Sequence, residues 1–260
     1  MTGLVSYGHA APPAHLPVAI DYPAALALRQ MAALVDDLPK HLLAPEVCAL
    51  LHFTPDLRRK MLFTTLWNTG ARISEALALI RGDFLLRQQY PFVQLATRKQ
   101  REDKAEHRAG RRAAGVVPHR LVPLSDAQYV TQLDMMIATL RIPIERRSEK
   151  TGRMERVRLW DITDRTARTW LNEATEAAAS EGVTFSVPVT LHTFRHSYAM
   201  HMLYAGTPLK ALQSLLGHKS AKSTEIYTRV FALDVTRQLG VRFSLDPAEA
   251  QRLLLPGEGL

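Results

Sequence analysis

Residues 190–228 constrain the fold of this chain most, because they contain two consecutive helix signals with well-defined starts and stops. Thr190 is predicted to cap a helix over residues 191–205, and Gly206 is predicted to end it. Thr207-Pro208 predicts the start of a second helix, which Gly217 stops. The buried stripe of the first helix is expected to contain Leu191, Phe194, Tyr198 and Met202.

Four polar residues stand at fixed places in this segment: His192, Arg195, His218 and Tyr227. His192 and Arg195 are three residues apart, so a helix brings them onto neighbouring faces. Far upstream, Arg72 is predicted at the start of another helix, where free N–H groups and the helix dipole favour an anion. Taken alone, Arg72 is explained more simply by an ion pair with a glutamate three residues later.

Together these residue types fit an attack on a phosphodiester. Cleavage builds negative charge on the nonbridging oxygens, and Arg72 and Arg195 could clamp it because arginine is always charged and presents a planar fork of donors. His192 and His218 could hydrogen-bond the phosphate or move a proton. Tyr227 supplies a phenol for covalent catalysis. Each residue alone also has a structural explanation, whereas one chemical explanation accounts for all five.

The segments that carry these residues resemble the tyrosine recombinase (phage integrase) family. The matching stretches are Thr69-Gly-Ala-Arg-Ile-Ser-Glu75, Leu191-His-Thr-Phe-Arg-His-Ser197, Leu215-Leu-Gly-His218 and Ile226-Tyr-Thr228, and the resemblance extends over roughly residues 42–231. It implies that the two arginines and two histidines act on the phosphate and that Tyr227 forms a 3′-phosphotyrosine. It also implies a supporting, structural role for Glu75.

The resemblance further implies a catalytic lysine in the hairpin after the second strand, where it would protonate the 5′ leaving oxygen. Lys99 is the best match in this sequence. Aligning the strand without a gap places Arg98 there instead, and Lys104 lies in the same loop. The general acid is therefore open between Lys99 and Lys104.

The predicted fold class is mostly α with a small antiparallel β-sheet (α+β), of the tyrosine recombinase catalytic type. Helices are expected over residues 22–37, 44–51, 55–69, 73–80, 125–140 and 164–181. Two strands, 92–96 and 120–124, enclose a long polar loop over residues 97–119. Gly70 suits the left-handed residue that closes its helix, and Pro123 predicts an edge strand.

Two regions are expected along the chain. Residues 1–41 form a short N-terminal arm rather than a full core-binding domain, and residues 42–260 form the catalytic domain with a C-terminal helix. That helix is predicted from Leu245 onward, and it either docks into a neighbouring protomer or packs on its own domain. Most members of the family close a clamp around DNA with a larger N-terminal domain. Here the arm, an accessory DNA-binding protein, or the catalytic domain itself would do that work.

Composition points to nucleic acid as the partner. The chain carries a net charge of +8 with a pI of about 9.8, and a basic excess attracts a polyanion. Between Arg98 and Arg120 the sequence contains eight Lys or Arg residues and only three Asp or Glu residues. There is no apolar run of membrane-spanning length and no signal-peptide pattern, and the single cysteine, Cys48, excludes an intrachain disulfide. These features favour a cytoplasmic protein with no metal and no cofactor.

The sequence therefore predicts a site-specific DNA recombinase that acts on double-stranded DNA as a homo-tetramer on two recombination sites. Its small size favours a plasmid- or transposon-borne resolvase. A type IB topoisomerase-like enzyme shares the chemistry but reseals the same strand. A DNA-binding protein that keeps the fold without catalysis is the alternative from a different class.

Overall fold

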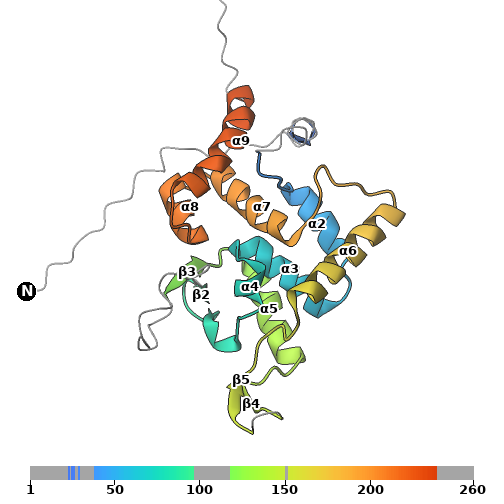
Figure 1. The fold of residues 1–260 in the computed structure, drawn as a ribbon, viewed down its shortest axis with the longest axis vertical. Helices are drawn as coiled ribbons and strands as arrows, with labels where there is room; N and C mark the ends of the chain where they lie inside the picture. The colour runs from blue at the N-terminus through green and yellow to red at the C-terminus, as the bar shows by residue number, and fades with distance from the viewer. Residues whose placement is uncertain are drawn as a thin grey trace, which may run out of the picture.

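The computed structural model describes residues 38–96, 118–149 and 152–238 and four positions near the N-terminus, Pro23, Ala25, Leu26 and Arg29, with side chains described as far as residue 232. The described chain is mostly helical, as predicted, and contains two small antiparallel sheets, of which the first was predicted (Figure 1). Among these residues, no helix is both long enough and apolar enough to cross a bilayer.

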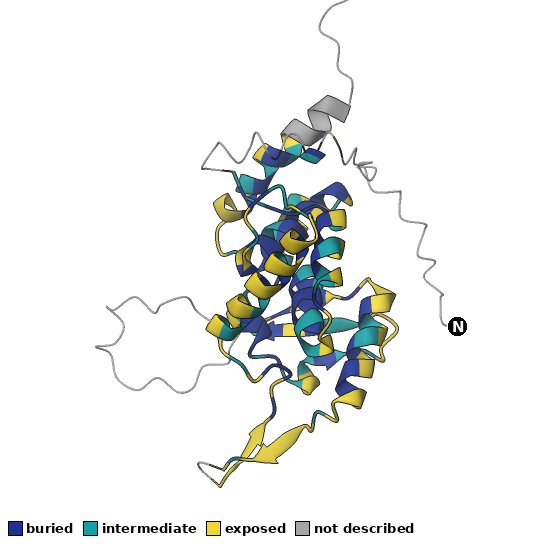
Figure 2. Ribbon diagram, turned by 90° about the vertical axis from the view of Figure 1, so that its right-hand side faces the viewer, coloured by how far each residue is buried: buried dark blue, intermediate teal, exposed yellow. Residues whose placement is uncertain are grey.

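Two helices form the centre of the core. Helices α3 (Leu57–Thr69) and α7 (Leu191–Tyr204) pack side by side, and the rings of Phe63 and Phe194 stack with centroids 5.6 Å apart. Helix α5 (Ala127–Thr139) packs on the other side of α3, where the hydroxyls of Thr65 and Tyr129 lie 2.8 Å apart. Helices α2 (Ala44–His52) and α6 (Asp164–Ser180) pack together. Figure 2 shows the buried residues running through the centre of this bundle.

Several helix ends follow the sequence signals. Thr163 and Thr190 cap α6 and α7 by accepting hydrogen bonds from the backbone N–H three residues on. Gly70 and Gly217 end α3 and α8 (Leu209–Leu216) in the left-handed conformation, at φ 59° and 64°. The prediction that Thr207 caps α8 was wrong: Pro208 holds the N-cap position and no side chain caps that end.

Two predictions of helical extent need correction. Helix α4 spans Ile73–Ala76 rather than 73–80, because the chain turns at Leu77 and Ile80 then forms an antiparallel bridge with Arg158. A short 3-10 turn, Arg81–Asp83, follows it. Helix α9 (Lys222–Gln238), which carries Tyr227, was not predicted.

The first sheet has the order β1 (Phe84–Leu85), β2 (Phe92–Ala96), β3 (His119–Pro123), all antiparallel. Pro123 lies on the edge strand β3, as predicted. The second sheet, the β4–β5 hairpin (Glu145–Arg147 and Met154–Arg156), was not predicted. Its strand residues are all exposed, and it projects from the bundle in Figures 1 and 2.

The described N-terminal positions contact the main body. Arg29 is buried and donates hydrogen bonds to His41 Nε2 and to Tyr204 Oη of α7, the latter at 2.8 Å. Its helical conformation agrees with the helix predicted over residues 22–37. The C-terminal helix predicted from Leu245 lies outside the described residues.

Replacement of Gly70 by alanine tests how tightly α3 and α7 approach each other. A Cβ at Gly70 would lie 2.4 Å from Tyr198 Cδ1, in addition to the cost of a left-handed conformation. We expect Gly70→Ala to lower the free energy of unfolding by about 3 kcal/mol, the sum of backbone strain and overpacking. Denaturant unfolding followed by circular dichroism measures the change.

Gly182→Ala is the matched control, because Gly182 has φ +80° and nothing within 4 Å of the added carbon. It should cost only about 1 kcal/mol, the backbone strain alone. Equal losses in the two variants would show that the contact with Tyr198 is not tight.

Candidate active site

The structure brings the five predicted non-lysine residues into one pocket. It is lined by Arg72, His192, Arg195, His196, His218, Ser220, Lys222, Ser223, Ile226 and Tyr227. Arg72 comes from the start of α4, the next three residues from the first two turns of α7, His218 from the end of α8, and Tyr227 from α9. Lys99, Lys104 and Arg98 lie outside the described residues, so the catalytic lysine remains a prediction.

Arg195 is the most deeply buried cation of the pocket, with 2% of the residue exposed. Its Nη1 donates to the carbonyl of Gly70 at 2.7 Å and its Nη2 donates to the carbonyl of Leu216 at 2.5 Å. These carbonyls belong to the C-terminal ends of α3 and α8, where the helix dipole favours a positive charge. Burial, together with nearby Arg72, lowers the pKa of Arg195 to about 10, which leaves it charged at neutral pH.

Arg72 is held by a carboxylate that lies behind the pocket. Its Nη1 and its backbone N–H both donate to Glu75, each at 2.9 Å. The predicted free N–H groups at this helix start are thus partly used, because Glu75 takes the N–H of Arg72 itself. The ion pair with Glu75 does form, but the side chain of Arg72 remains 26% exposed and lines the pocket.

Arg120 was missed by the sequence analysis and completes this network. From strand β3 it donates to both Glu75 oxygens, at 3.1 and 2.6 Å, and its Nε donates to the carbonyl of Leu215. Burial acts to raise the pKa of the Glu75 carboxyl, but the hydrogen bonds and charges of Arg120 and Arg72 outweigh it and lower that pKa. The signal was available: strand alternation places Arg120 on the same buried face as Val122.

The two predicted histidines are neutral hydrogen-bonding groups in this pocket. Burial, then Arg195 and Arg72, lowers the pKa of His192 and lowers that of His218 to about 4. His218 Nδ1 lies 2.8 Å from Thr224 Oγ1 of α9, which fixes the ring. Each ring therefore has a nitrogen that can serve an oxygen of a bound phosphate.

Tyr227 points into the same pocket from α9 although only 1% of the residue is exposed. Burial raises the pKa of its phenol to about 12, against the opposing effect of Arg195 and Arg72. Its hydroxyl lies 3.0 Å from Nδ1 of His196. The phenol is thus protonated at neutral pH and hydrogen-bonded to a neighbouring imidazole.

His196 lines the pocket beside Tyr227, and the sequence analysis left it out of the site. It follows Arg195 directly and lies four residues after His192, so it shares the face of α7 that carries His192. Its ring meets those of His192 and Tyr227 edge-on, at centroid distances of 4.5 and 5.6 Å. The same i, i+4 spacing could have identified it.

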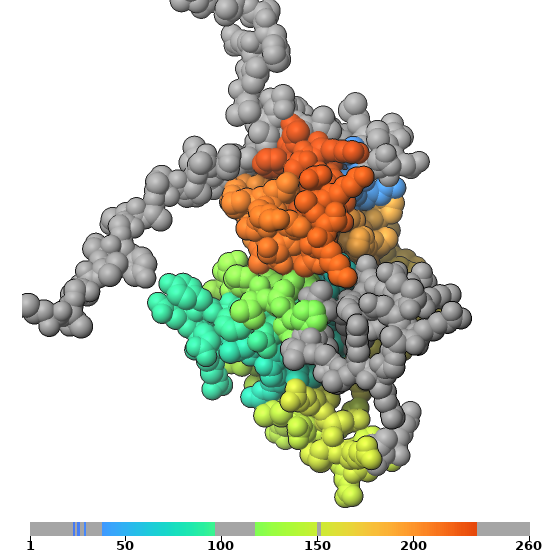
Figure 3. All heavy atoms as spheres, turned by 60° about the vertical axis from the view of Figure 1, so that its left-hand side comes forward, coloured from blue at the N-terminus to red at the C-terminus, as the bar shows by residue number. Residues whose placement is uncertain are grey.

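The pocket lining is cationic. Arg72, Arg195 and Lys222 line it, and none of the lining residues in the described part of the chain is a carboxylate. In Figure 3 the C-terminal helices (orange) lie directly against the yellow-green part of the surface, which includes strand β3, and helix α8 contacts that strand. A site with fixed arginines, neutral imidazoles and a phenol is suited to bind an anion and attack it.

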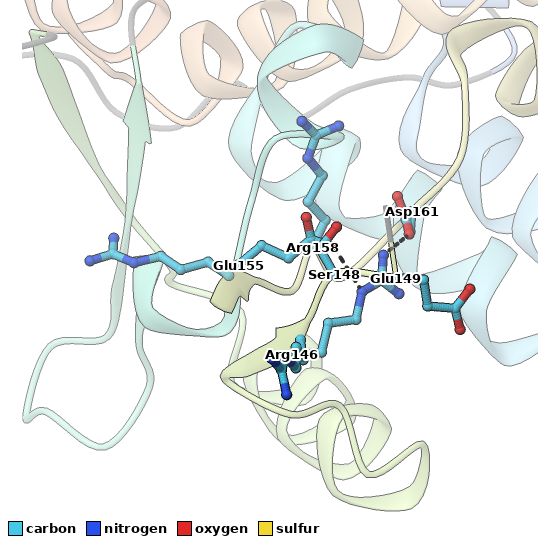
Figure 4. A pocket seen from close by; sticks show the side chains of 8 residues that line it. Arg146, Ser148, Glu149, Glu155, Arg158 and Asp161 are labelled. Carbon is cyan, nitrogen blue, oxygen red and sulfur yellow. Dashed lines mark hydrogen bonds and ion pairs between the residues drawn. The ribbon is translucent and has the colours of Figure 1, made fainter. Parts of the chain in front are cut away.

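A second hollow lies at the β4–β5 hairpin (Figure 4). Its arginines are accompanied by acids: Arg146 donates to Glu155 at 3.2 Å and to Asp161 at 2.8 Å. The hollow also contains Glu149, so opposite charges offset one another there. It lacks the combination of buried arginine and phenol that marks the first pocket.

Comparison with known proteins places the chain in a family. Residues 40–233 match the model described as "Phage integrase family". The chain is 68% identical to a protein named "Resolvase" from Escherichia coli over 95% of each chain. It is 46% identical to a "Probable site-specific recombinase in afa region" from Escherichia coli, over 92% of this chain and 91% of that one.

A solved structure agrees with this fold. The crystal structure of the XerA recombinase superposes with a TM-score of 0.55 at 20% identity, covering 79% of this chain and 67% of that chain. At this identity the likeness concerns the fold, which confirms the predicted catalytic-domain architecture.

The buried neutral histidines should make the free energy of unfolding depend on pH. Burial first, then nearby cations, lowers the pKa of both His41 and His196 to about 3, against about 6.5 in an unfolded chain. As the pH falls, these histidines take up a proton in the unfolded state at a higher pH than in the folded state. The stability that the two neutral histidines contribute is therefore complete above pH 6.5 and is lost as the pH falls toward 3. Each titrating histidine should cost up to about 1.4 kcal/mol per pH unit in that window.

Denaturant unfolding between pH 7 and 4 measures this slope. In His196→Asn the slope should decrease by about one proton, because one of the histidines with a lowered pKa is gone. Identical slopes in the variant and the parent protein would contradict the assignment.

Proposed function

Because the chain belongs to the phage integrase family of tyrosine recombinases, we propose that it is a site-specific DNA recombinase that cuts and rejoins DNA through a 3′-phosphotyrosine. The observation that carries the proposal is the position of Tyr227 in one pocket with two arginines and two histidines. A phosphodiester supplies the anion that such a pocket would bind.

In the proposed cleavage step, Arg72 and Arg195 hold the nonbridging oxygens of one phosphate. Because Arg195 is fixed by two carbonyls, its fork needs little reorganisation as charge builds on the oxygens. His192 and His218 donate further hydrogen bonds. Tyr227 Oη bonds to phosphorus while the bond from phosphorus to the 5′ oxygen breaks, and the 5′ oxygen receives a proton from Lys99 or Lys104.

In the proposed rejoining step, a 5′ hydroxyl from a partner duplex attacks the phosphotyrosine. The new bond from phosphorus to oxygen replaces the bond to Tyr227, and the phenol regains its proton. The energy of the phosphodiester is kept in the covalent intermediate, so the reaction needs no nucleotide hydrolysis. Exchange of strands between two duplexes follows if two sites are held together, which we propose happens in a homo-tetramer.

For the biological role we favour resolution of DNA multimers or cointegrates, since a relative that is 68% identical is named a resolvase. Double-stranded DNA is the proposed partner, in keeping with the net charge of +8. We propose residues 1–41 as a short arm and residues 42–260 as the catalytic domain. The contact of Arg29 with His41 and Tyr204 supports an arm that rests on the catalytic domain. Whether an accessory protein completes the grip is testable by recombination with purified components.

Tyr227→Phe tests the nucleophile. We expect this variant to bind its DNA site with unchanged affinity and to form no covalent adduct, because only the attacking oxygen is removed. A nicked suicide substrate, which loses the fragment needed for rejoining, traps the adduct of the parent protein for detection on a denaturing gel. Equal adduct from the phenylalanine variant would assign the nucleophile elsewhere.

Two labelled duplexes in the same reaction separate the rival functions. A recombinase yields products that join the two labels, whereas a topoisomerase-like enzyme reseals each duplex and relaxes supercoils. A protein that only binds DNA gives neither product and no adduct.

Substitution of each candidate lysine tests the general acid. Removing it should slow cleavage by about 10²–10⁴-fold, the usual contribution of such a group. A substrate with sulfur in place of the 5′ bridging oxygen needs no acid, since a thiolate leaves readily. We therefore expect this substrate to restore cleavage in the variant of the true acid, Lys99→Ala or Lys104→Ala. A variant that is slow on both substrates identifies a lysine with another role.

A further inference from the structure

We propose that His196 is a catalytic residue that accepts the proton of Tyr227 as the phenol oxygen attacks phosphorus. This inference rests on the proposed function, because it concerns the same cleavage step. The proton moves from Tyr227 Oη to His196 Nδ1 while the bond from Oη to phosphorus forms. The separate proton gained by the 5′ oxygen comes from the lysine on the other side of the phosphate. In rejoining, His196 returns the proton to the departing phenol.

The distance is the first argument. His196 Nδ1 lies 3.0 Å from Tyr227 Oη, within the range required of a base and its acid. It is the hydrogen-bond partner of that oxygen among the described residues. His192 and His218 line the same pocket, but the described hydrogen bond of the His218 ring goes to Thr224.

The protonation state is the second argument. A base must be unprotonated before the reaction, and burial keeps the His196 imidazole neutral at physiological pH. After burial, His192 and Arg195 on α7 and His218 after α8 lower its pKa further. With Nδ1 free of a proton, the ring accepts the hydrogen bond from the phenol.

The timing of transfer follows from these charges. The Tyr227 phenol holds its proton firmly in the free protein, and a cation on His196 is unfavourable there. As Oη bonds to phosphorus the proton on Oη becomes strongly acidic. Transfer to His196 is therefore coupled to bond formation rather than completed before it. A bound phosphate also offsets the charge of Arg195, which otherwise repels a proton on His196.

His196→Asn separates this role from positioning. The asparagine side-chain oxygen can accept the hydrogen bond from Tyr227 close to the place of Nδ1, but it cannot take up the proton. We expect single-turnover cleavage of a nicked substrate to slow by about 10²–10³-fold, within the range for loss of a general base, with unchanged DNA affinity. His201→Asn is the matched control on the same helix outside the pocket, and it should cleave at the parent rate.

Fluorinated tyrosine at position 227 provides the decisive readout. Fluorine makes the phenol more acidic, so a proton acceptor matters less. In a His196→Asn background, replacing Tyr227 with a trifluorotyrosine should bring the rate within about tenfold of the same substitution in the parent. The proposal is overturned, and His196 is a positioning residue, if His196→Asn slows cleavage by the same factor with trifluorotyrosine as with tyrosine. It is also overturned if the His196→Asn variant cleaves within threefold of the parent rate.

The outcomes separate this inference from the proposed function. If the parent protein forms no adduct with its DNA site, the proposed function itself fails. If the parent forms the adduct and His196→Asn equals it, only the role of His196 fails.

Discussion

The geometry of this site depends on the burial of one guanidinium. Removing the charge of Arg195 from water is costly unless hydrogen bonds replace its hydration. The replacement comes from the carbonyls of Gly70 and Leu216, which are free because α3 and α8 both end there. Arg195 therefore ties the ends of two helices to α7, and the same two hydrogen bonds fix the position of its guanidinium in the pocket.

The two glycines that end these helices serve the site as well as the helices. At Gly70 a side chain would collide with Tyr198, so α3 reaches α7 closely enough for its last carbonyl to meet Arg195. At Gly217 a Cβ would lie 3.1 Å from Arg120 Cδ, and Arg120 holds the Glu75 carboxylate that in turn holds Arg72. The same two glycines therefore end the helices and allow the arginines to take their positions. This coupling explains why the short α4 suffices to fix Arg72.

These features also mark how far the sequence could lead. Helix-end signals and the types of polar residues predicted Arg72, His192, Arg195, His218 and Tyr227, and the structure gathers all five in one pocket. The cap at Thr190 and the edge position of Pro123 depend on local chemistry, so local patterns predicted them.

What the sequence left out depends on contacts between distant segments. Arg120 acts through Glu75, 45 residues away, and His196 through Tyr227, 31 residues away, so neither partner is visible in a local pattern. Helix α9 was missed because Tyr227 was considered as a chemical group rather than as part of a helical stripe. The β4–β5 hairpin has no buried face, and therefore no apolar alternation to reveal it.

The nucleophile is also connected to both ends of the described chain. Helix α9 packs on α7, where the rings of Phe231 and Tyr204 lie 5.7 Å apart. Arg29, from the N-terminal segment, bonds to the hydroxyl of the same Tyr204. A displacement of α9 along α7 would change the distance from Tyr227 to Arg195 and His196 and would disturb this contact as well. Tyr204 is therefore the point at which the N-terminal segment and the helix that carries Tyr227 constrain each other.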